Sequence, residues 1–212
     1  MISITTDTVT EAAKEGFFNL LSCPQNTSDP TILRESVAAI EVTNPSLEQQ
    51  GFIIQNNSFV YQKNYQDYIP SIDTELVSEE ERDYTRLFIS SGHIDSIIHH
   101  LIKFPASRRN LISSWAPIYL DPTVVGVCIT HLYFRLYNGK LEVHSHARAN
   151  DAYRLLLLDM QLATSIQAEV AKAIDKPVGK YIHFSDSLHF YKQYENVIEQ
   201  QKAYMTTSEI WA

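Results

Sequence analysis

A cysteine and an arginine lie near the two ends of a predicted β-hairpin. Cys128 belongs to the apolar run VVGVCITHLYF, and in such surroundings a thiol is most often buried and inert. It becomes a nucleophile when a nearby cation favours the thiolate, and Arg148 is the candidate. With Asn138-Gly139 as a two-residue turn, position 129 faces position 148, so strict alternation puts Cys128 and Arg148 on opposite faces. A β-bulge or a bend at the strand end is needed to bring them together.

A second candidate is an acidic residue on the apolar side of a predicted helix. Asp159 falls within a stripe of hydrophobic residues at helical spacing, namely Leu155, Leu158, Leu162, Ile166 and Val170. A carboxylate on a buried face is costly unless it is hydrogen-bonded or neutralised. Either an internal partner satisfies Asp159, or it faces a pocket and meets a ligand.

Histidines and paired arginines form two further groups. His144 and His146 lie on the same face of a predicted strand, and His131 lies cross-strand from His146, so the three offer metal-ligand spacing. No acidic partner supports a metal there, and a metal centre is the weaker interpretation. Arg108 and Arg109 are either solvent-exposed charge or a fork for a phosphate or carboxylate group.

The composition limits the classes of function that remain. The 212 residues suggest one domain, and 44% hydrophobic with 20% charged residues is an ordinary globular balance. Seventeen Lys and Arg against 25 Asp and Glu give a net charge of −8, which argues against general binding to nucleic acid. The sequence has no signal peptide, no apolar run of about 18 residues and no Gly-rich phosphate loop. We expect a soluble, cytoplasmic protein without a membrane partner.

Residue patterns predict the elements that must position these side chains. In the first part, residues 8–22 indicate a helix, and residues 36–43 and 51–61 have strand character. The polar, acidic segment 63–83 is the most loop-like and the one plausible seam. A short helix at 94–104 is ended by Pro105.

The second part has a clearer pattern. Strands are expected at residues 111–115, 124–137 and 141–148, the last two joined by the Asn138-Gly139 turn. A long helix at 151–174, a strand at 180–184 and a helix at 191–202 follow. Strands followed by long helices, with a hairpin in place of regular βαβ alternation, indicate an α+β fold.

Taken together, these residues resemble the thymidylate synthase family, which includes pyrimidine nucleotide C5-hydroxymethylases. The resemblance rests on SRRNLISSW, Cys128, ARANDAYRLLLLDM and HFSDSLHFY, within residues 84–191. Members place an arginine, an aspartate, a base-recognising residue and a His-x-Tyr pair 20, 23, 31, 61 and 63 positions after the nucleophilic cysteine. Counted from Cys128, these positions are occupied by Arg148, Asp151, Asp159, His189 and Tyr191.

The resemblance implies a fold and a set of binding residues. The fold is a single thymidylate synthase-like domain over residues 1–212, more divergent in its N-terminal third (1–83), with a mixed sheet packed by a long buried helix and a two-fold dimer through the sheet. The substrate is a pyrimidine nucleoside monophosphate. Its phosphate is bound by Arg148, by Arg34 within a segment similar to compact archaeal members, and by Arg108 and Arg109 from the partner subunit. Asp151 also belongs to the substrate site, and His189 and Tyr191 bind the sugar hydroxyl.

The resemblance also implies a reaction. The Cys128 thiolate adds to C6 of the pyrimidine, and C5 then attacks the one-carbon unit of 5,10-methylenetetrahydrofolate, with no metal involved. Thymidylate synthases carry asparagine at the position of Asp159, whereas cytosine hydroxymethylases carry aspartate, which accepts from the cytosine amine. We therefore expect hydroxymethylation of CMP or dCMP. The general base is one of Glu75, Glu79, Glu80 and Glu81.

Departures from the family pattern keep two alternatives open. Val127 and Ile129 replace the usual proline and histidine around the cysteine, and Ser187 replaces an aspartate. Residues 155–159 lack the glycine and proline that lie near folate in the family, and 21 residues follow Tyr191. Methylation of dUMP and a nucleotide-binding homologue without folate chemistry are the two alternatives.

Overall fold

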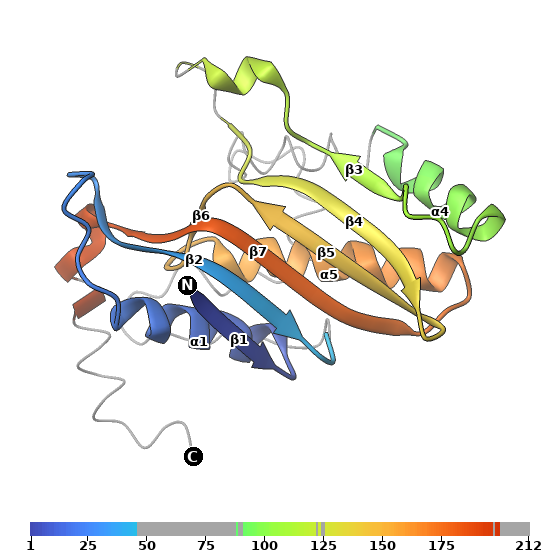
Figure 1. Ribbon diagram of the computed structural model, residues 1–212, viewed down its shortest axis with the longest axis horizontal. Coiled ribbons are helices and arrows are strands. Elements are labelled where there is room, and N and C mark those ends of the chain that lie inside the picture. Colours follow the sequence, from blue (N-terminus) through green and yellow to red (C-terminus); the bar gives the residue numbers. More distant parts are fainter. Residues whose placement is uncertain (46–87, 89–90, 122, 124–125, 197, 200–212) are drawn as a thin grey trace, which may run out of the picture.

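The computed structural model describes residues 1–45, 88, 91–121, 123, 126–196 and 198–199. The expected strand at 51–61, the polar segment 63–83 and the four candidate glutamates lie outside these residues. In the described part, helices pack on one mixed β-sheet (Figure 1). The arrangement confirms the predicted α+β class and the mixed sheet.

The sheet has the strand order β1-β2-β7-β5-β4-β3, and β6 pairs with β7 beside this path. Pairing is parallel for β1–β2, β7–β5 and β7–β6, and antiparallel for β2–β7, β5–β4 and β4–β3. Among the described strands, the central strand β7 comes last in the sequence. The strands are β1 (Ile2–Thr6), β2 (Ile32–Val42), β3 (Leu111–Ser113), β4 (Ile129–Tyr137), β5 (Lys140–Ala147), β6 (Asn150–Asp151) and β7 (Val178–Tyr191).

Two helices cover one face of this sheet. Helix α1 (Val9–Leu21) packs on β1 and β2, and α5 (Leu156–Ala173) packs on β5 and β7 (Figure 1). The two helices meet at Gly16, where a Cβ atom would lie 2.9 Å from Leu156 Cδ2, so the close approach requires glycine. The N-terminus of α1 is capped by Thr8, which accepts from the Glu11 N–H at 3.2 Å.

Helix α5 is the buried helix that the sequence predicted. All residues from Leu156 to Gln167 are buried, so the helix has no solvent face over its first three turns. Gln167 Nε2 donates to the carbonyls of Leu141, Gly179 and Lys180 at 2.9–3.1 Å, which ties the helix to the strands β5 and β7. A third helix, α4 (His93–Lys103), lies at the end of the sheet opposite the start of α5 (Figure 1).

The hairpin prediction is confirmed, whereas several boundaries were wrong. Asn138 and Gly139 have φ angles of 50° and 77°, as a type I′ turn requires. The long helix begins at residue 156 and not at 151, because Asn150 and Asp151 pair with β7 as a short strand. Strand β7 continues to Tyr191, well beyond the predicted end at 184, and the sequence did not predict β1. After β7 the chain forms a 3₁₀ turn (Lys192–Tyr194), and residues 195–196 and 198–199 are α-helical, in agreement with the helix expected at 191–202 as far as that span is described.

No described helix combines the length and hydrophobicity that crossing a membrane demands.

Candidate active site

One end of the sheet collects most of the predicted site residues. Strands β5 and β7 end there, β2 and β4 begin there, and α5 starts beneath them (Figure 1). This end therefore carries Arg34, Cys128, Arg148, Asp159 and the His189–Tyr191 pair. We call it the site end.

A one-residue β-bulge aligns Cys128 with Arg148. The hairpin register pairs His131 with His146, but then pairs Ile129 with Ala147, so Thr130 is the extra residue. The shift brings position 128 opposite position 148, and the Arg148 N–H donates to the Cys128 carbonyl at 2.9 Å. Directly opposed residues project to the same face of a sheet. The bulge that the sequence argument needed is present.

The Arg148 guanidinium lies against the segment that leads into Cys128. Its Nε donates to the Val127 carbonyl at 2.9 Å and its Nη2 to the Gly126 carbonyl at 3.0 Å. The ring of Trp115 stacks on it, 5.6 Å from the centroid to Cζ. A Cβ atom at position 126 would lie 3.1 Å from Nη2, so glycine makes room for this arrangement. The half-buried Cys128 thus sits beside a fixed cation that neutral carbonyls hold.

Asp159 lies in the first turn of α5 and is almost completely buried, with 4% of its surface exposed. The Nδ2 of Asn150, which is fully buried on β6, donates to Asp159 Oδ2. The structure therefore supplies the internal partner that one interpretation of the sequence required. It also places the carboxyl group at the site end, as the other interpretation required.

A second buried polar cluster lies between β5 and β7 under the same helix. Ser145 Oγ lies 2.6 Å from Tyr181 Oη and 2.8 Å from His183 Nδ1, and all three residues are buried. Burial lowers the pKa of His183 to about 4, with His146 contributing. Burial also raises the pKa of Tyr181, and the negative charge of Asp159 adds to this shift. At neutral pH the cluster is uncharged.

His189 presents an acceptor at the site end. Its Nδ1 lies 3.0 Å from the Ser187 carbonyl, which can only accept, so Nδ1 carries the proton in the neutral ring. The Nε2 atom is then a bare acceptor, and it is buried without a hydrogen-bond partner among the described residues. The ring stacks edge-on against Tyr191 at 4.7 Å. A sugar hydroxyl is the kind of donor that this nitrogen lacks.

The side chain of Asp151 is hydrogen-bonded to residues that follow it closely in the sequence. Its carboxylate accepts from the backbone N–H groups of Tyr153 and Arg154 and, at 2.6 Å, from Arg154 Nε. These bonds turn the chain from β6 into α5 and account for the late start of the helix. The role of Asp151 toward substrate stays a prediction.

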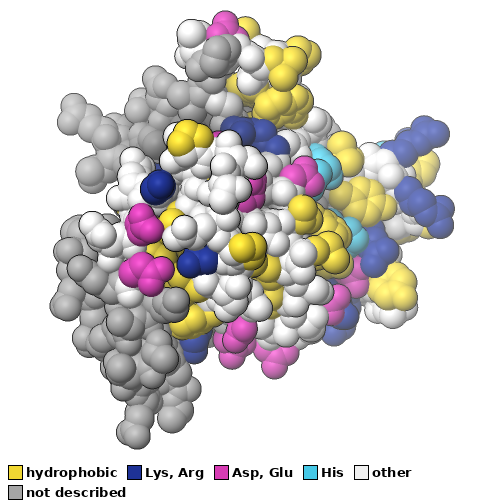
Figure 2. Space-filling model, turned by 60° about the vertical axis from the view of Figure 1, so that its left-hand side comes forward, with side chains coloured by type: hydrophobic (Ala, Val, Ile, Leu, Met, Phe, Trp, Pro, Cys, Tyr) yellow, Lys and Arg dark blue, Asp and Glu magenta, His cyan; other side chains and the backbone are white. Residues whose placement is uncertain are grey.

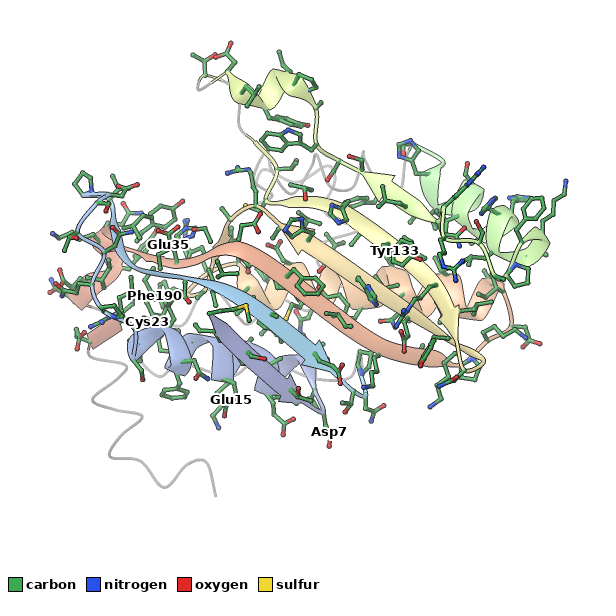
Figure 3. The ribbon with its side chains drawn as sticks, in the orientation of Figure 1. Asp7, Glu15, Cys23, Glu35, Tyr133 and Phe190 are labelled. Carbon is green, nitrogen blue, oxygen red and sulfur yellow. The ribbon has the colours of Figure 1, made fainter. Side chains whose placement is uncertain are left out.

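Arg34 reaches the site end from β2, where it pairs with Phe190. Its Nη1 donates to the carbonyl of Cys23, which lies near Phe190 in Figure 3, and its Nη2 lies 3.9 Å from Glu199. The Nε atom is buried without a partner in the described part of the chain. The guanidinium thus has a donor to offer a ligand.

Arg108 and Arg109 lie at the opposite end of the sheet from Cys128. Both side chains are exposed. The backbone carbonyl of the next residue, Asn110, accepts from the N–H of Phe134 on β4. Phe134 is six residues beyond Cys128 in the sequence. At the rise of a strand this separates them from Cys128 by about 20 Å. A single chain therefore does not bring them into the site, and their reach into a partner's site stays a prediction.

The three histidines considered for a metal lie on the open face of the sheet, the face that neither α1 nor α5 covers. The rings of His131 and His146 are 5.0 Å apart, while His144 packs on Tyr133 (labelled in Figure 3). Burial lowers the pKa of both His131 and His144. Among the residues with described positions, no three His, Cys, Asp or Glu side chains are arranged to hold a metal ion.

Sequence reasoning missed Asn150 and Trp115 as parts of this site. Asn150 stands next to Asp151 in the ARANDAYR segment, but a single buried amide carries no periodic signal. Trp115 ends the SRRNLISSW segment, and only the structure shows its ring against Arg148.

Comparisons with known proteins identify one family. A family model described as thymidylate synthase matches residues 61–209. Thymidylate synthase from Staphylococcus haemolyticus is 24% identical over 113 residues, covering 52% of this chain and 36% of the relative. The enzyme from Bacillus atrophaeus is 25% identical over 120 residues, covering 56% and 53%. The chain thus spans about half or less of the length of these curated relatives.

A solved structure extends the similarity to the fold of nearly the whole chain. Thermostable thymidylate synthase A from Bacillus subtilis superposes with a TM-score of 0.68 over 92% of this chain and 83% of its own, at 14% identity. At that identity the likeness concerns the fold.

Proposed function

Since the chain belongs to the thymidylate synthase family, we propose that it transfers a one-carbon unit to C5 of a pyrimidine nucleoside monophosphate. The substrate is a cytosine nucleotide, CMP or dCMP, and the product is its 5-hydroxymethyl derivative. The observation that carries the proposal is the buried Asp159 carboxyl group at the end of the sheet that also holds Cys128 and Arg148.

The reaction begins at Cys128. Its thiolate forms a bond to C6 of the ring, and the displaced electron pair makes C5 nucleophilic. C5 bonds to the methylene carbon that methylenetetrahydrofolate supplies. A base then removes the C5 proton, the bond between that carbon and the folate nitrogen breaks, and tetrahydrofolate leaves. Water adds to the resulting exocyclic methylene, and the Cys128 sulfur leaves C6.

Asp159 supports cytosine as the base. Cytosine presents an amino group at C4, and a carboxylate oxygen accepts from such an amine. A proton shared between the carboxyl group and N3 completes the pair. Uracil presents a carbonyl at the same place, so an ionised Asp159 would meet it with two acceptors in contact, a mismatch of about 1–3 kcal/mol.

The phosphate and sugar fit the remaining residues. Arg148 is held by neutral carbonyls, and a phosphate dianion is a stronger acceptor for a guanidinium than a carbonyl. Arg34 has an unpartnered buried Nε within the described residues, and His189 offers Nε2 to a sugar hydroxyl. This local set explains how a chain of net charge −8 binds an anion.

The second subunit of the proposed two-fold dimer covers the open face of the sheet. Exposed hydrophobic side chains, including Val37, Leu111 and Phe184, gather there, and a hollow of about 550 Å³ lies among them. Figure 2 shows His side chains next to hydrophobic ones on the molecular surface. A partner on this face would bring its Arg108 and Arg109 toward the site that one chain leaves incomplete.

Release of tritium from [5-³H]CMP and [5-³H]dCMP in the presence of methylenetetrahydrofolate tests the reaction. The wild-type protein should release tritium, and Cys128→Ala should lower the rate by roughly three orders of magnitude or more. Cys23→Ala is the matched control, because Cys23 is a half-buried cysteine away from Arg148 and should keep full activity. Tritium release that persists in Cys128→Ala would show that Cys128 is not the nucleophile.

A ligand panel tests the base preference separately. Thermal unfolding with CMP, dCMP, UMP and dUMP should show stabilisation by a cytosine nucleotide, about 2.7 kcal/mol at 100 times Kd. Preference for dUMP would indicate thymidylate synthase-like methylation in place of the proposed reaction. Tight binding of CMP without any C5 exchange would indicate a nucleotide-binding homologue.

A further inference from the structure

The ionised Asp159 carboxylate disfavours uracil, but a protonated carboxyl group alone does not distinguish cytosine from uracil. A protonated carboxyl group has one donor and one acceptor oxygen, and the proton can sit on either one. With the proton toward N3 the group pairs with cytosine, and with the proton toward position 4 it pairs with uracil. Something in the site must therefore decide which Asp159 oxygen carries the proton.

Asn150 is in contact with one of these two oxygens. Its Nδ2 donates to Asp159 Oδ2, and both residues are buried, Asn150 completely and Asp159 to within 4%. A hydrogen bond that donates to an oxygen disfavours a proton on that same oxygen. The shared proton is consequently directed to Oδ1, and Oδ2 is kept as an acceptor.

The other end of the Asn150 amide strengthens this argument. Its Oδ1 is buried and has no hydrogen-bond partner in the described part of the chain, so Asp159 is the one group that orients the amide. With Nδ2 against Oδ2, as the structure has it, Oδ2 accepts from Asn150 and does not donate to a base.

Short strand β6 fixes Asn150 in this place. Asn150 pairs with Leu188 of β7, and the next residue, Asp151, pairs with His189. Asp151 in turn holds the N–H groups of the turn that begins α5, the helix that carries Asp159. Asn150 and Asp159 thus lie on either side of one tight turn, and the backbone of that turn sets the distance between them.

We propose that Asn150 is a positioning residue that keeps Asp159 Oδ2 as an acceptor toward the 4-amino group and so sets the preference for cytosine over uracil. This inference rests on the proposed function. Asn150 acts through Asp159 and needs no contact with the nucleotide itself.

The ratio of the Kd values for UMP and CMP, measured by calorimetry, tests the inference. In Asn150→Ala the ratio should fall by about tenfold or more, because the proton on Asp159 is free to occupy either oxygen. Gln167→Met is the matched control: it removes another buried amide, on α5 at the end of the sheet away from the site, and should lower the melting temperature while leaving the ratio unchanged. An unchanged ratio in a folded Asn150→Ala protein would overturn the inference.

A second variant keeps the test decisive if alanine prevents folding. In Asn150→Asp the new carboxyl group can donate to Oδ2 while it is protonated, but not once both groups are ionised. The preference for CMP should therefore weaken as pH rises from about 5 to 8, whereas wild type should not show this trend. Identical pH profiles for the two proteins would contradict the role of Asn150.

Failure of this inference is distinguishable from failure of the proposed function. If wild type shows no preference for CMP or dCMP over the uracil nucleotides, the proposed function is wrong. If wild type prefers the cytosine nucleotides and both Asn150 variants keep the wild-type ratio and pH profile, then Asn150 is a structural residue only.

Discussion

The two faces of the sheet use the same strands for different purposes. On the covered face, β5 and β7 contribute Ser145, Tyr181 and His183, which are buried and hydrogen-bonded to one another under α5. On the open face, the alternate residues include His146 and Phe184, which are paired in register and partly exposed. One face is complete within the chain, whereas the other exposes aromatic and hydrophobic side chains.

This difference has a counterpart along the length of the sheet. The site end holds the cysteine, the buried carboxyl group and two arginines, but Arg108 and Arg109 are about 20 Å away at the other end. An open apolar face and a displaced pair of cations have a common explanation in a second copy of the chain. The comparison therefore predicts that substitutions on the open face affect catalysis, while those on the covered face affect stability.

The largest effect is expected from a charge placed on the open face. In Phe184→Glu the proposed dimer should not form, because an unpaired carboxylate would be buried in its interface, and tritium release should fall by about a hundredfold or more. Light scattering and the tritium assay measure the two quantities. Ile118→Glu, which puts the same charge on an exposed isoleucine outside the sheet, should change neither. A dimeric and active Phe184→Glu protein would remove the open face from the proposed interface.

Mixing two inactive variants should restore part of the activity. One carries Cys128→Ala, and the other carries Arg108→Ala with Arg109→Ala. A mixed dimer has two sites. One of them combines the intact Cys128 of the arginine variant with the intact Arg108 and Arg109 of the cysteine variant, and only this site is active. With random pairing about a quarter of the wild-type activity returns after subunit exchange. Activity that stays at background after verified exchange would place Arg108 and Arg109 outside the partner's site.

A smaller effect is expected from the buried histidine of the covered face. Between pH 6.5 and 5 the unfolded chain binds a proton on His183, whereas the folded chain binds it only near pH 4. The unfolded state binds more protons in this window, so stability falls with falling pH, by roughly 2 kcal/mol. Denaturant unfolding of wild type and His183→Gln at both pH values should show that the variant lacks this part of the loss. His99→Gln, at an exposed helical position, should keep the wild-type dependence.

Local patterns predicted the hairpin and the buried helix, and they showed that Cys128 and Arg148 could meet only through a bulge or a bend. The Asn138-Gly139 turn fixed the register closely enough to show that a bulge was needed. The hydrophobic stripe around Asp159 likewise identified a buried carboxyl group. In each case the signal lay in neighbouring residues or in a fixed spacing.

Long-range pairing determined what the sequence did not predict. Residues 185–187 read Ser-Asp-Ser and suggested the end of a strand, but pairing with β2 and with β5 or β6 extends β7 through them. The same pairing draws Asn150 into the core, where it meets Asp159. Partners supplied by distant segments leave no periodic trace in the segment itself.

The position of β7 in the sheet has a consequence for how the protein folds during its synthesis. This strand joins β2 to β5 and comes last in the sequence among the described strands, so a ribosome completes it after the other strands that the structure describes. Until then, β2 and β5 each present an unpaired edge. Pairing between strands that are far apart in the sequence is slow, so the pairing of β7 with β2 and β5 should be a slow folding step. Before β7 is inserted, the unpaired edges of β2 and β5 would be the sites most prone to chaperone binding and aggregation. Insertion of β7 would cover both edges and would complete the proposed nucleotide site in the same step.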